Sequence, residues 1–322
     1  MPSSGRVPAS GVGASVVAIV NPRASNGAAS RRWPAVQAAL RRHWPNLAVR
    51  QTEAPEHATQ LTREVLEDGA EMVISVGGDG TNNEVLGGFV DAKGRNRFPE
   101  AILGVIASGT GGDFQRMWGP LEPHRQVDRL ARAPVRTIDY GLARFTGHEG
   151  QQVIRPFLNI ASVGISGLVD RYVNSGGRMF GNTVAYVAAS LKGIVAYENR
   201  RVVLTFEDGD PRELDLSLLV IGNGQYFGAG MWACPEAELD DGAFDTILLP
   251  GFRKPDIVKV LAKVFAGKHL DFPGLESGRA KKISLRPALP GTEVLLDIDG
   301  EQPGRLPATF EVVPQSLRLR IA

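Results

Sequence analysis

The stretch VISVGGDGTNNEVLGG, residues 73–88, decides the fold. A short apolar run of the kind found in buried strands ends in three glycines that surround a single acid, Asp79. Glycines in such a loop let backbone N–H groups approach a phosphate without a Cβ atom in the way. Thr81 and Glu84 have the spacing of a capping box, which predicts a helix that begins at Thr81 with its positive end toward the loop. A strand, a glycine loop and a helix in this order predict a phosphate-binding site.

The same alternation of strand and helix extends from residue 16 to about residue 139. Strands are predicted at residues 16–21, 48–52, 72–76 and 102–106, and helices at 30–43, 56–68 and 81–89. Such alternation predicts a largely parallel sheet with helices on both faces and a ligand at the carboxyl ends of the strands. The fold class is therefore an α/β nucleotide-binding domain.

Beyond residue 139 the pattern changes to short strands separated by Gly, Pro and Asp turns. This predicts a mostly antiparallel β-sandwich with helices inserted at 183–197 and 255–265. The final run could return to the first domain. The predicted division is a loose leader at 1–14, a catalytic domain at 15–140, an acceptor domain at 141–308 and a C-terminal strand at 309–322.

Composition excludes several classes of protein. The chain has 322 residues, of which 43% are hydrophobic and 22% charged, so a disordered chain or a coiled coil is excluded. Lys and Arg total 36 against 35 acidic residues, a balance that predicts no nucleic-acid partner. The single cysteine, Cys234, predicts no disulfide within the chain. No stretch resembles a signal peptide or a membrane span, so we expect a soluble cytoplasmic protein.

A second glycine-rich loop, in GVIASGTGGDFQRMWG at residues 104–119, follows the fourth predicted strand. Two such loops at neighbouring strand ends could hold one polyphosphate between them. Asp79 would then lie beside phosphates, an arrangement that requires a divalent cation between the anions. Asn21, at the end of the first strand, could donate to a phosphate or form an Asx turn.

The late segment LLDIDGEQPG, residues 295–304, contains an Asp-Gly pair that is typical of a hairpin turn. Taken alone, it predicts a type I′ turn with two exposed acids, Asp299 and Glu301. The P-loop, the complete GxGxxG fingerprint, the HExxH helix and the GxSxG elbow are all absent from the sequence. The common nucleotide and hydrolase motifs therefore do not apply.

The segments NPRASNG, GGDGTNNE, GTGGDF and DGE, in this order and spacing, resemble the diacylglycerol kinase catalytic-domain family, which includes bacterial soluble lipid kinases and the sphingosine and ceramide kinases. The resemblance covers residues 16–319. It implies an α/β domain like that of NAD kinases and diacylglycerol kinases, joined to a C-terminal β-sandwich, with ATP and Mg²⁺ in the cleft between them. The implied reaction transfers the γ-phosphoryl group to the hydroxyl of a membrane lipid, diacylglycerol or a sphingoid-type lipid, by an enzyme that is peripheral at the membrane surface.

The resemblance also implies roles for individual residues. The implied ATP contacts are Asn21, Thr52, Gly77, Gly78, Asp79, Gly80, Thr81, Asn82, Asn83, Gly109 and Thr110. The implied acids around the catalytic magnesium, in direct, water-mediated or more remote contact with it, are Asp79, Asp113 and Asp139. A structural magnesium would be held by the Asp241 carboxylate and the backbone carbonyls of Glu238 and Ala243. Asp299 and Glu301 are candidates for the catalytic base, and Asp79 completes the catalytic set. The family has Asn where this chain has Gly112, so one polar contact in the cleft is missing and a water molecule could replace it.

Two alternatives remain open at this stage. NAD kinases share the GGDGT segment, and a nucleotide-binding regulatory protein without catalysis would also keep the loops.

The helix around residues 255–268 has an apolar stripe with four lysines, which suits either packing on the sandwich or a transient contact with a membrane surface. A homodimer is compatible with the sequence.

Overall fold

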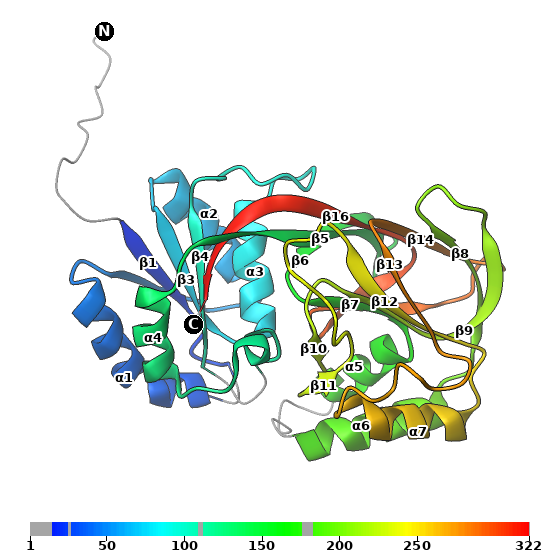
Figure 1. The fold of residues 1–322 in the computed structure, drawn as a ribbon. Helices are drawn as coiled ribbons and strands as arrows, with labels where there is room; N and C mark the ends of the chain where they lie inside the picture. The colour runs from blue at the N-terminus through cyan, green and yellow to red at the C-terminus, as the bar shows by residue number, and fades with distance from the viewer. Residues whose placement is uncertain (1–14, 25–26, 109–111, 176–182, 322) are drawn as a thin grey trace, which may run out of the picture.

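The computed structural model describes residues 15–24, 27–108, 112–175 and 183–321 (Figure 1). One sheet of fourteen strands runs through both halves of the molecule. Its longest path has the order β13-β12-β9-β7-β15-β16-β4-β3-β1-β2, and β5, β6, β8 and β14 pair beside this path. The chain therefore forms one continuous mixed sheet where we expected a parallel sheet and a separate sandwich.

The first half of the sheet is parallel. Its strands are β1 (Val16–Val20), β2 (Ala48–Gln51), β3 (Met72–Gly77) and β4 (Ile102–Ala107), and all their pairings are parallel. Alternate side chains face opposite layers, because Val17 and Ile19 belong to one core cluster and Val16 and Val20 to another. The first cluster includes residues of α2 (His57–Glu67) and α3 (Asp79–Phe89), and the second those of α1 (Ala28–His43) and α4 (Pro123–Arg132).

The second half of the sheet is antiparallel. Its strands are β5 (Arg136–Gly147), β6 (Gln152–Phe157), β7 (Ile160–Gly164), β8 (Arg200–Phe206), β9 (Arg212–Gly222), β12 (Phe244–Pro250), β13 (Glu276–Ala280), β14 (Lys282–Pro287), β15 (Leu295–Ile298) and β16 (Glu301–Ile321). The short strands β10 (Tyr226–Phe227) and β11 (Met231–Trp232) form a separate pair. The helices α5 (Ile165–Ser175), α6 (Thr183–Ala196) and α7 (Lys254–Val264) lie below the sheet in Figure 1.

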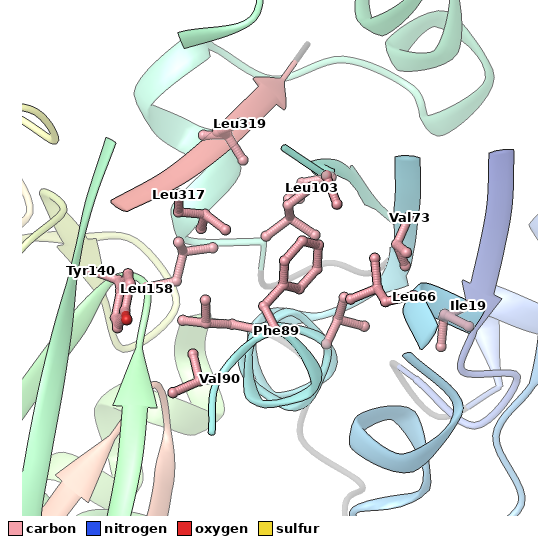
Figure 2. Packing of buried hydrophobic residues seen from close by; sticks show 14 of the residues in the cluster. Ile19, Leu66, Val73, Phe89, Val90, Leu103, Tyr140, Leu158, Leu317 and Leu319 are labelled. Atoms are coloured by element: carbon pink, nitrogen blue, oxygen red, sulfur yellow. The ribbon is translucent and has the colours of Figure 1, made fainter. Parts of the chain in front are cut away.

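The 21-residue strand β16 connects the halves. Its last residues pair in parallel with β4, and its earlier residues pair antiparallel with β5, β14 and β15. Figure 2 shows Leu317 and Leu319 of β16 in the same cluster as Phe89 of α3 and Tyr140 of β5. Because β5 and β16 run unbroken across residues 140 and 308, no linker separates the halves at these positions.

Two helices were not expected from the sequence. α4 has only two buried aliphatic side chains, Val127 and Leu130, so its apolar periodicity is weak. α5 begins directly after the last residue of β7, Gly164, and we expected a strand over residues 157–165 and no element over the rest of the helix. Short apolar runs do not distinguish a buried strand from a buried helix.

Candidate active site

The loop between β3 and α3 is held tightly against the first turn of the helix. A Cβ atom on Gly77 would lie 2.4 Å from Oγ1 of Thr81, so the chain requires glycine there. Gly78 is extended and precedes the first residue of α3, Asp79. The helix thus begins two residues earlier than expected, and its first N–H groups face the loop.

The expected capping box does not form, because its two side chains have partners from other elements. Oγ1 of Thr81 accepts a hydrogen bond of 3.1 Å from the Asn21 amide, and the Glu84 carboxylate accepts one of 3.1 Å from the Ala58 backbone N–H. Asn21 Oδ1 also accepts the N–H of Arg23, which is an Asx turn. Asn21 therefore ties the end of β1 to the start of α3.

Asp79 and Asp113 lie side by side at this loop. The Asp79 carboxylate accepts hydrogen bonds from the backbone N–H groups of Asp113 and Phe114, at 2.9 and 3.2 Å. The Asp113 carboxylate accepts one from Arg116 Nε and one from Ala229 N–H. Burial raises the pKa of both carboxyls, and together with the neighbouring Asp79 charge it raises the pKa of Asp113 to about 7. The pair therefore needs positive charge that Arg116 only partly supplies.

The other expected nucleotide contacts divide into three groups. Thr52 is buried at the end of β2, where its N–H donates to the carbonyl of Val20 at the end of β1. The side chains of Asn82 and Asn83 face into the protein, where Asn82 accepts a hydrogen bond from Ser75 and Asn83 donates to Asp299. Gly109 and Thr110 lie outside the described residues.

Asp139 lies in a different cluster from Asp79 and Asp113, contrary to our expectation. Its buried carboxylate accepts hydrogen bonds from the N–H groups of Gly242 and Gln315, and its pKa is raised first by burial and then by Asp241. These two backbone donors fix Asp139 against the segment that precedes β12. Its role as a ligand around the catalytic magnesium is therefore not supported by its position.

The segment from Glu238 to Ala243 does not fit the structural magnesium that we expected. The two Asp241 oxygens accept hydrogen bonds from the Ala243 N–H and from the Arg279 guanidinium. Arg279 Nε also lies 3.9 Å from Asp245 Oδ2. A fixed guanidinium thus stands where the cation would bind, and we assign no metal to this segment.

The Asp-Gly turn forms as expected between β15 and β16, but Asp299 is buried. Ile298 pairs with Glu301 across the turn, and Asp299 and Gly300 both have positive φ, at 49° and 83°. Asp299 accepts four hydrogen bonds, from Asn83 Nδ2 and from the N–H groups of Leu158, Asn159 and Ile160. Despite these donors, burial raises its pKa to about 6.

Glu301 points from the turn toward the glycine loop. A Cβ atom on Gly80 would lie 3.0 Å from Glu301 Oε1, while Glu301 Oε2 pairs with Arg155 at 2.5 Å. Arg155 Nε donates to Asn83 Oδ1 at 2.7 Å. The carboxyl group of Glu301 therefore lies over the start of α3, held there by Arg155 from β6.

Behind the turn lies a buried polar cluster that the sequence analysis did not identify. Asp297 accepts hydrogen bonds from the Ser162 hydroxyl and from the N–H of Gly300, and the Ser162 oxygen in turn accepts one from the Ser166 hydroxyl. Burial raises the pKa of Asp297, with the neighbouring Asp170 as the next cause, and burial raises the pKa of Asp170 to about 6. The cluster connects the turn between β15 and β16 to α5.

An almost entirely apolar cavity continues from this cluster. Its walls come from α5, α6, α7, β9 and β12, and include Val169, Ile194, Val220, Ile247 and Leu261. The cluster residue Ser166 and Tyr186, whose hydroxyl lies 3.4 Å from Asp170, line the same cavity. The polar cluster and the apolar cavity therefore adjoin at Ser166 and Tyr186.

Sequence reasoning missed Arg155 and Arg116, which supply the positive charge near the acids. Arg116 could have been noticed from its position three residues after Asp113, whereas Arg155 meets Glu301 only through the fold. Among the described residues, no group of three or more His, Cys, Asp or Glu side chains could hold a metal ion. Within the same residues, no helix combines the length and apolarity needed to cross a membrane.

Comparison with known sequences follows the same two halves. The diacylglycerol kinase catalytic domain matches residues 15–143, and the YegS C-terminal NAD kinase beta sandwich-like domain matches residues 159–321. A Pseudomonas aeruginosa protein named "Probable lipid kinase YegS-like" is 30% identical over 297 residues, which are 89% of this chain and 88% of that protein. A diacylglycerol kinase of Staphylococcus carnosus is 25% identical over 302 residues, 94% of this chain and 93% of that one.

Solved structures show the same fold. A diacylglycerol kinase from Bacillus anthracis aligns with a TM-score of 0.66 and 21% identity over 95% of this chain and 96% of that chain. Yeast NADH kinase aligns with a TM-score of 0.53 and 10% identity over 96% and 83%. The two-domain class is confirmed, and the protein is a kinase. More closely, the chain belongs to the family of diacylglycerol kinases and YegS-like lipid kinases.

Proposed function

We propose that the protein transfers the γ-phosphoryl group of ATP to the hydroxyl group of a membrane lipid, with Mg²⁺ as the cation. One observation carries this proposal. The turn after β15 places Glu301 against Gly80 at the start of α3 on one side, and Asp297 against the polar end of the apolar cavity on the other. The nucleotide phosphates and an apolar chain would thus meet at the turn between β15 and β16.

The phosphates of ATP would bind the N–H groups at the start of α3. Anions are stabilised at a helix N-terminus by its unpaired N–H groups and by the helix dipole. Asn21 and Thr52, at the ends of β1 and β2, border the same edge of the sheet. This arrangement supports ATP as the phosphoryl donor.

Asp79 and Asp113 fit a magnesium ion that also binds the phosphates. Mg²⁺ is usually held by one or two carboxylates together with phosphate oxygens and water, so a pair of acids is sufficient. Burial raises the pKa of both carboxyls, and the Asp79 charge raises that of Asp113 further, so a cation between them would stabilise their ionised forms. A bound magnesium ion would neutralise the charge that develops on the transferred phosphoryl group.

Glu301 is the better candidate for the catalytic base. A carboxylate has about four lone-pair sites, and those of Asp299 are occupied by four N–H donors. Asp299 could accept a proton only by losing one of these hydrogen bonds. Among the described residues, no such donor bonds to Oε1 of Glu301, and this oxygen faces the glycine loop between β3 and α3. Asp299 instead fixes the turn to β7 and α3.

Arg155 acts as a positioning residue for Glu301. Its guanidinium joins Glu301 to Asn83, and Asn83 is itself bonded to Asp299. This network fixes the side chain of Glu301 relative to the first turn of α3. A bidentate guanidinium gives geometric precision that the single ammonium group of lysine does not.

Phosphoryl transfer makes one bond to the γ-phosphorus and breaks another. The acceptor oxygen forms a bond to the γ-phosphorus as the bond from that phosphorus to the bridging oxygen of ADP breaks. The hydroxyl proton passes to the Glu301 carboxylate, late in a loose transition state, because a carboxylate is too weak a base to ionise an alcohol beforehand. ADP and the lipid phosphate are released.

The apolar cavity favours a lipid acceptor over NAD. A nicotinamide nucleotide requires polar contacts for its ribose and phosphate groups, whereas the cavity beyond the turn is lined almost entirely by aliphatic and aromatic side chains. The apolar lining of the cavity suits an acyl or sphingoid chain.

The test is transfer of labelled γ-phosphate from ATP and Mg²⁺ to diacylglycerol, sphingosine and phosphatidylglycerol in mixed micelles, with NAD as a parallel acceptor. The proposal expects label in a lipid product, and none without a divalent cation. Label on NAD instead of lipid would contradict it.

A further inference from the structure

A second cavity, of about 400 Å³, lies where the end of β16 meets α4 and the start of β5. α4 and the end of β16 are neighbours in the fold (Figure 1). None of the residues that line this cavity belongs to the glycine loop, to the turn between β15 and β16 or to the apolar cavity. The second cavity is therefore distinct from the candidate active site, and its size suits a small organic molecule.

One part of its lining is apolar. Four buried aliphatic side chains and one indole form this part, those of Ile138, Leu239, Leu319, Ile321 and Trp118. The four aliphatic residues belong to the core cluster that packs between the sheet and α3, so the cavity reaches the edge of that core. Such a surface favours the hydrocarbon part of a ligand.

The other part of the lining is basic. Arg129, Arg132 and Arg136 line the cavity, and no Asp or Glu is among the described residues that do so. Arg136 already forms a salt bridge. Arg132, in the last turn of α4, is exposed and has no hydrogen bond or salt bridge with another described residue. The acid one turn earlier on α4, Asp128, is engaged by His43. The positive charge at the cavity is therefore not balanced from within the described chain.

The guanidinium of Arg129 has one edge in use and one edge without a partner. Its Nη1 donates a hydrogen bond of 2.8 Å to the carbonyl of Trp118. Its Nε and Nη2 are buried and have no hydrogen-bond partner among the described residues. These two N–H groups lie on the same edge of the planar group, which is the edge that binds two oxygens of an oxyanion at once. Buried charged donors without a partner are costly, and a bound oxyanion would satisfy both.

We propose that this cavity is a binding site for a phosphate monoester with a small apolar group. The phosphate would bind the free edge of Arg129, and the apolar group would lie against Leu319 and Ile321. A phosphate monoester carries close to two negative charges at neutral pH, which match the charges of Arg129 and Arg132. This inference goes beyond the proposed function, because no residue of the proposed catalytic set lines the cavity.

The test is isothermal titration calorimetry of the full chain with hexyl phosphate as the probe. Inorganic phosphate and hexanol, which each carry half of the probe, should bind at least about tenfold more weakly than hexyl phosphate. Hexanoate, which has a single charge, should bind about threefold or more weakly. Hexyl phosphate should also raise the Tm, because it binds the folded chain.

Three variants of α4 locate the site. Arg129→Gln should weaken the binding of hexyl phosphate by about tenfold or more and remove its effect on Tm. Arg132→Gln should weaken binding by about threefold, because Arg132 is exposed. Arg125→Gln is the matched control, since it removes the same charge from an exposed position on the same helix that does not line the cavity. This control should bind like the wild type.

Four results would overturn the proposal. The first is a wild type that does not bind hexyl phosphate, and the second is wild-type affinity in both Arg129→Gln and Arg132→Gln. The third is inorganic phosphate, hexanol or hexanoate that binds as tightly as hexyl phosphate, because the cavity would then not select both parts of the ligand. The fourth is an equal loss in Arg125→Gln and Arg132→Gln, which would show a general effect of charge. If Arg129→Gln does not fold, Arg132→Gln decides, because its side chain has no hydrogen bond within the described chain to lose.

Discussion

The parallel and antiparallel halves present their functional groups in different ways. In the parallel half, polar groups lie in loops beyond the ends of β1, β2 and β3 and at the first turn of α3. In the antiparallel half, apolar side chains of the sheet and of α5, α6 and α7 enclose a cavity. Under the proposed function, each half would bind one kind of substrate, an anionic nucleotide or an apolar chain. The turn between β15 and β16 is where the two can react.

The largest effect should come from the acids of the parallel half. Asp79→Asn should lower kcat by about 10³-fold or more, because it removes a proposed ligand of the ion that neutralises the phosphoryl group. Asp241→Asn is the matched control in the second acid cluster, and its activity should stay within about twofold because Asp241 is engaged by Arg279. Initial rates with ATP and diacylglycerol measure both. Full activity of Asp79→Asn with native circular dichroism would remove Asp79 from the mechanism.

The second-largest loss of activity should distinguish the roles of Asp299 and Glu301 in the turn. Glu301→Gln should lower kcat by about 10²-fold with little change in Tm, because it removes the base. Asp299→Asn should cost about 1–3 kcal/mol of stability, because its amide nitrogen would oppose N–H donors that the carboxylate now accepts. Rates and thermal unfolding of both variants decide between them. An inactive Asp299→Asn of unchanged Tm, beside an active Glu301→Gln, would reverse the assignment.

Substitutions of Arg155 test how Glu301 is positioned in the same turn. Arg155→Lys should lower kcat by about tenfold and leave the KM for ATP unchanged, because the lysine can pair with Glu301 but not also hold Asn83. Arg155→Met should lose more activity than Arg155→Lys. Equal losses in the two variants would show that the guanidinium geometry has no part in positioning Glu301.

The smallest effect concerns the buried acid pair in the antiparallel half. The folded-state pKa of Asp297 is raised by burial and then by Asp170, so the native protein holds the proton more tightly than the unfolded chain. Stability should therefore fall as the pH rises through about 6, the pKa of Asp170. The asparagine of Asp297→Asn cannot ionise. The Tm of this variant minus that of the wild type should therefore rise by about 2 °C or more from mildly acidic to mildly alkaline pH. A Tm difference that is independent of pH would contradict this.

The parallel half was largely predictable from sequence, because its signals are local. The four strands and three helices around the glycine loop follow from short apolar runs and helical spacing, and they form within a few residues of the expected bounds. The expected capping box failed because Asn21 and Ala58, distant in sequence, engage Thr81 and Glu84. Local chemistry therefore predicted the elements but not all their partners.

The antiparallel half was predicted only as a class. Its key contacts join residues far apart in the chain, such as Asp299 with Leu158 and Arg155 with Glu301. Asp139 was assigned to the wrong cluster, because sequence does not show that Gly242 and Gln315 would bind it. The cavity could not be predicted because its walls come from three helices and several strands that no local pattern brings together.

The most direct test of the division between the halves is a crossed measurement of KM for ATP and for dioleoylglycerol in two variants. Asn21→Ala loosens the phosphate loop, and Leu261→Phe narrows the cavity. We predict that Asn21→Ala raises the KM for ATP about tenfold and leaves that for the lipid unchanged, and that Leu261→Phe does the reverse. If Leu261→Phe raised the KM for ATP and left that for the lipid unchanged, the antiparallel half would not bind the acceptor and the account would be contradicted.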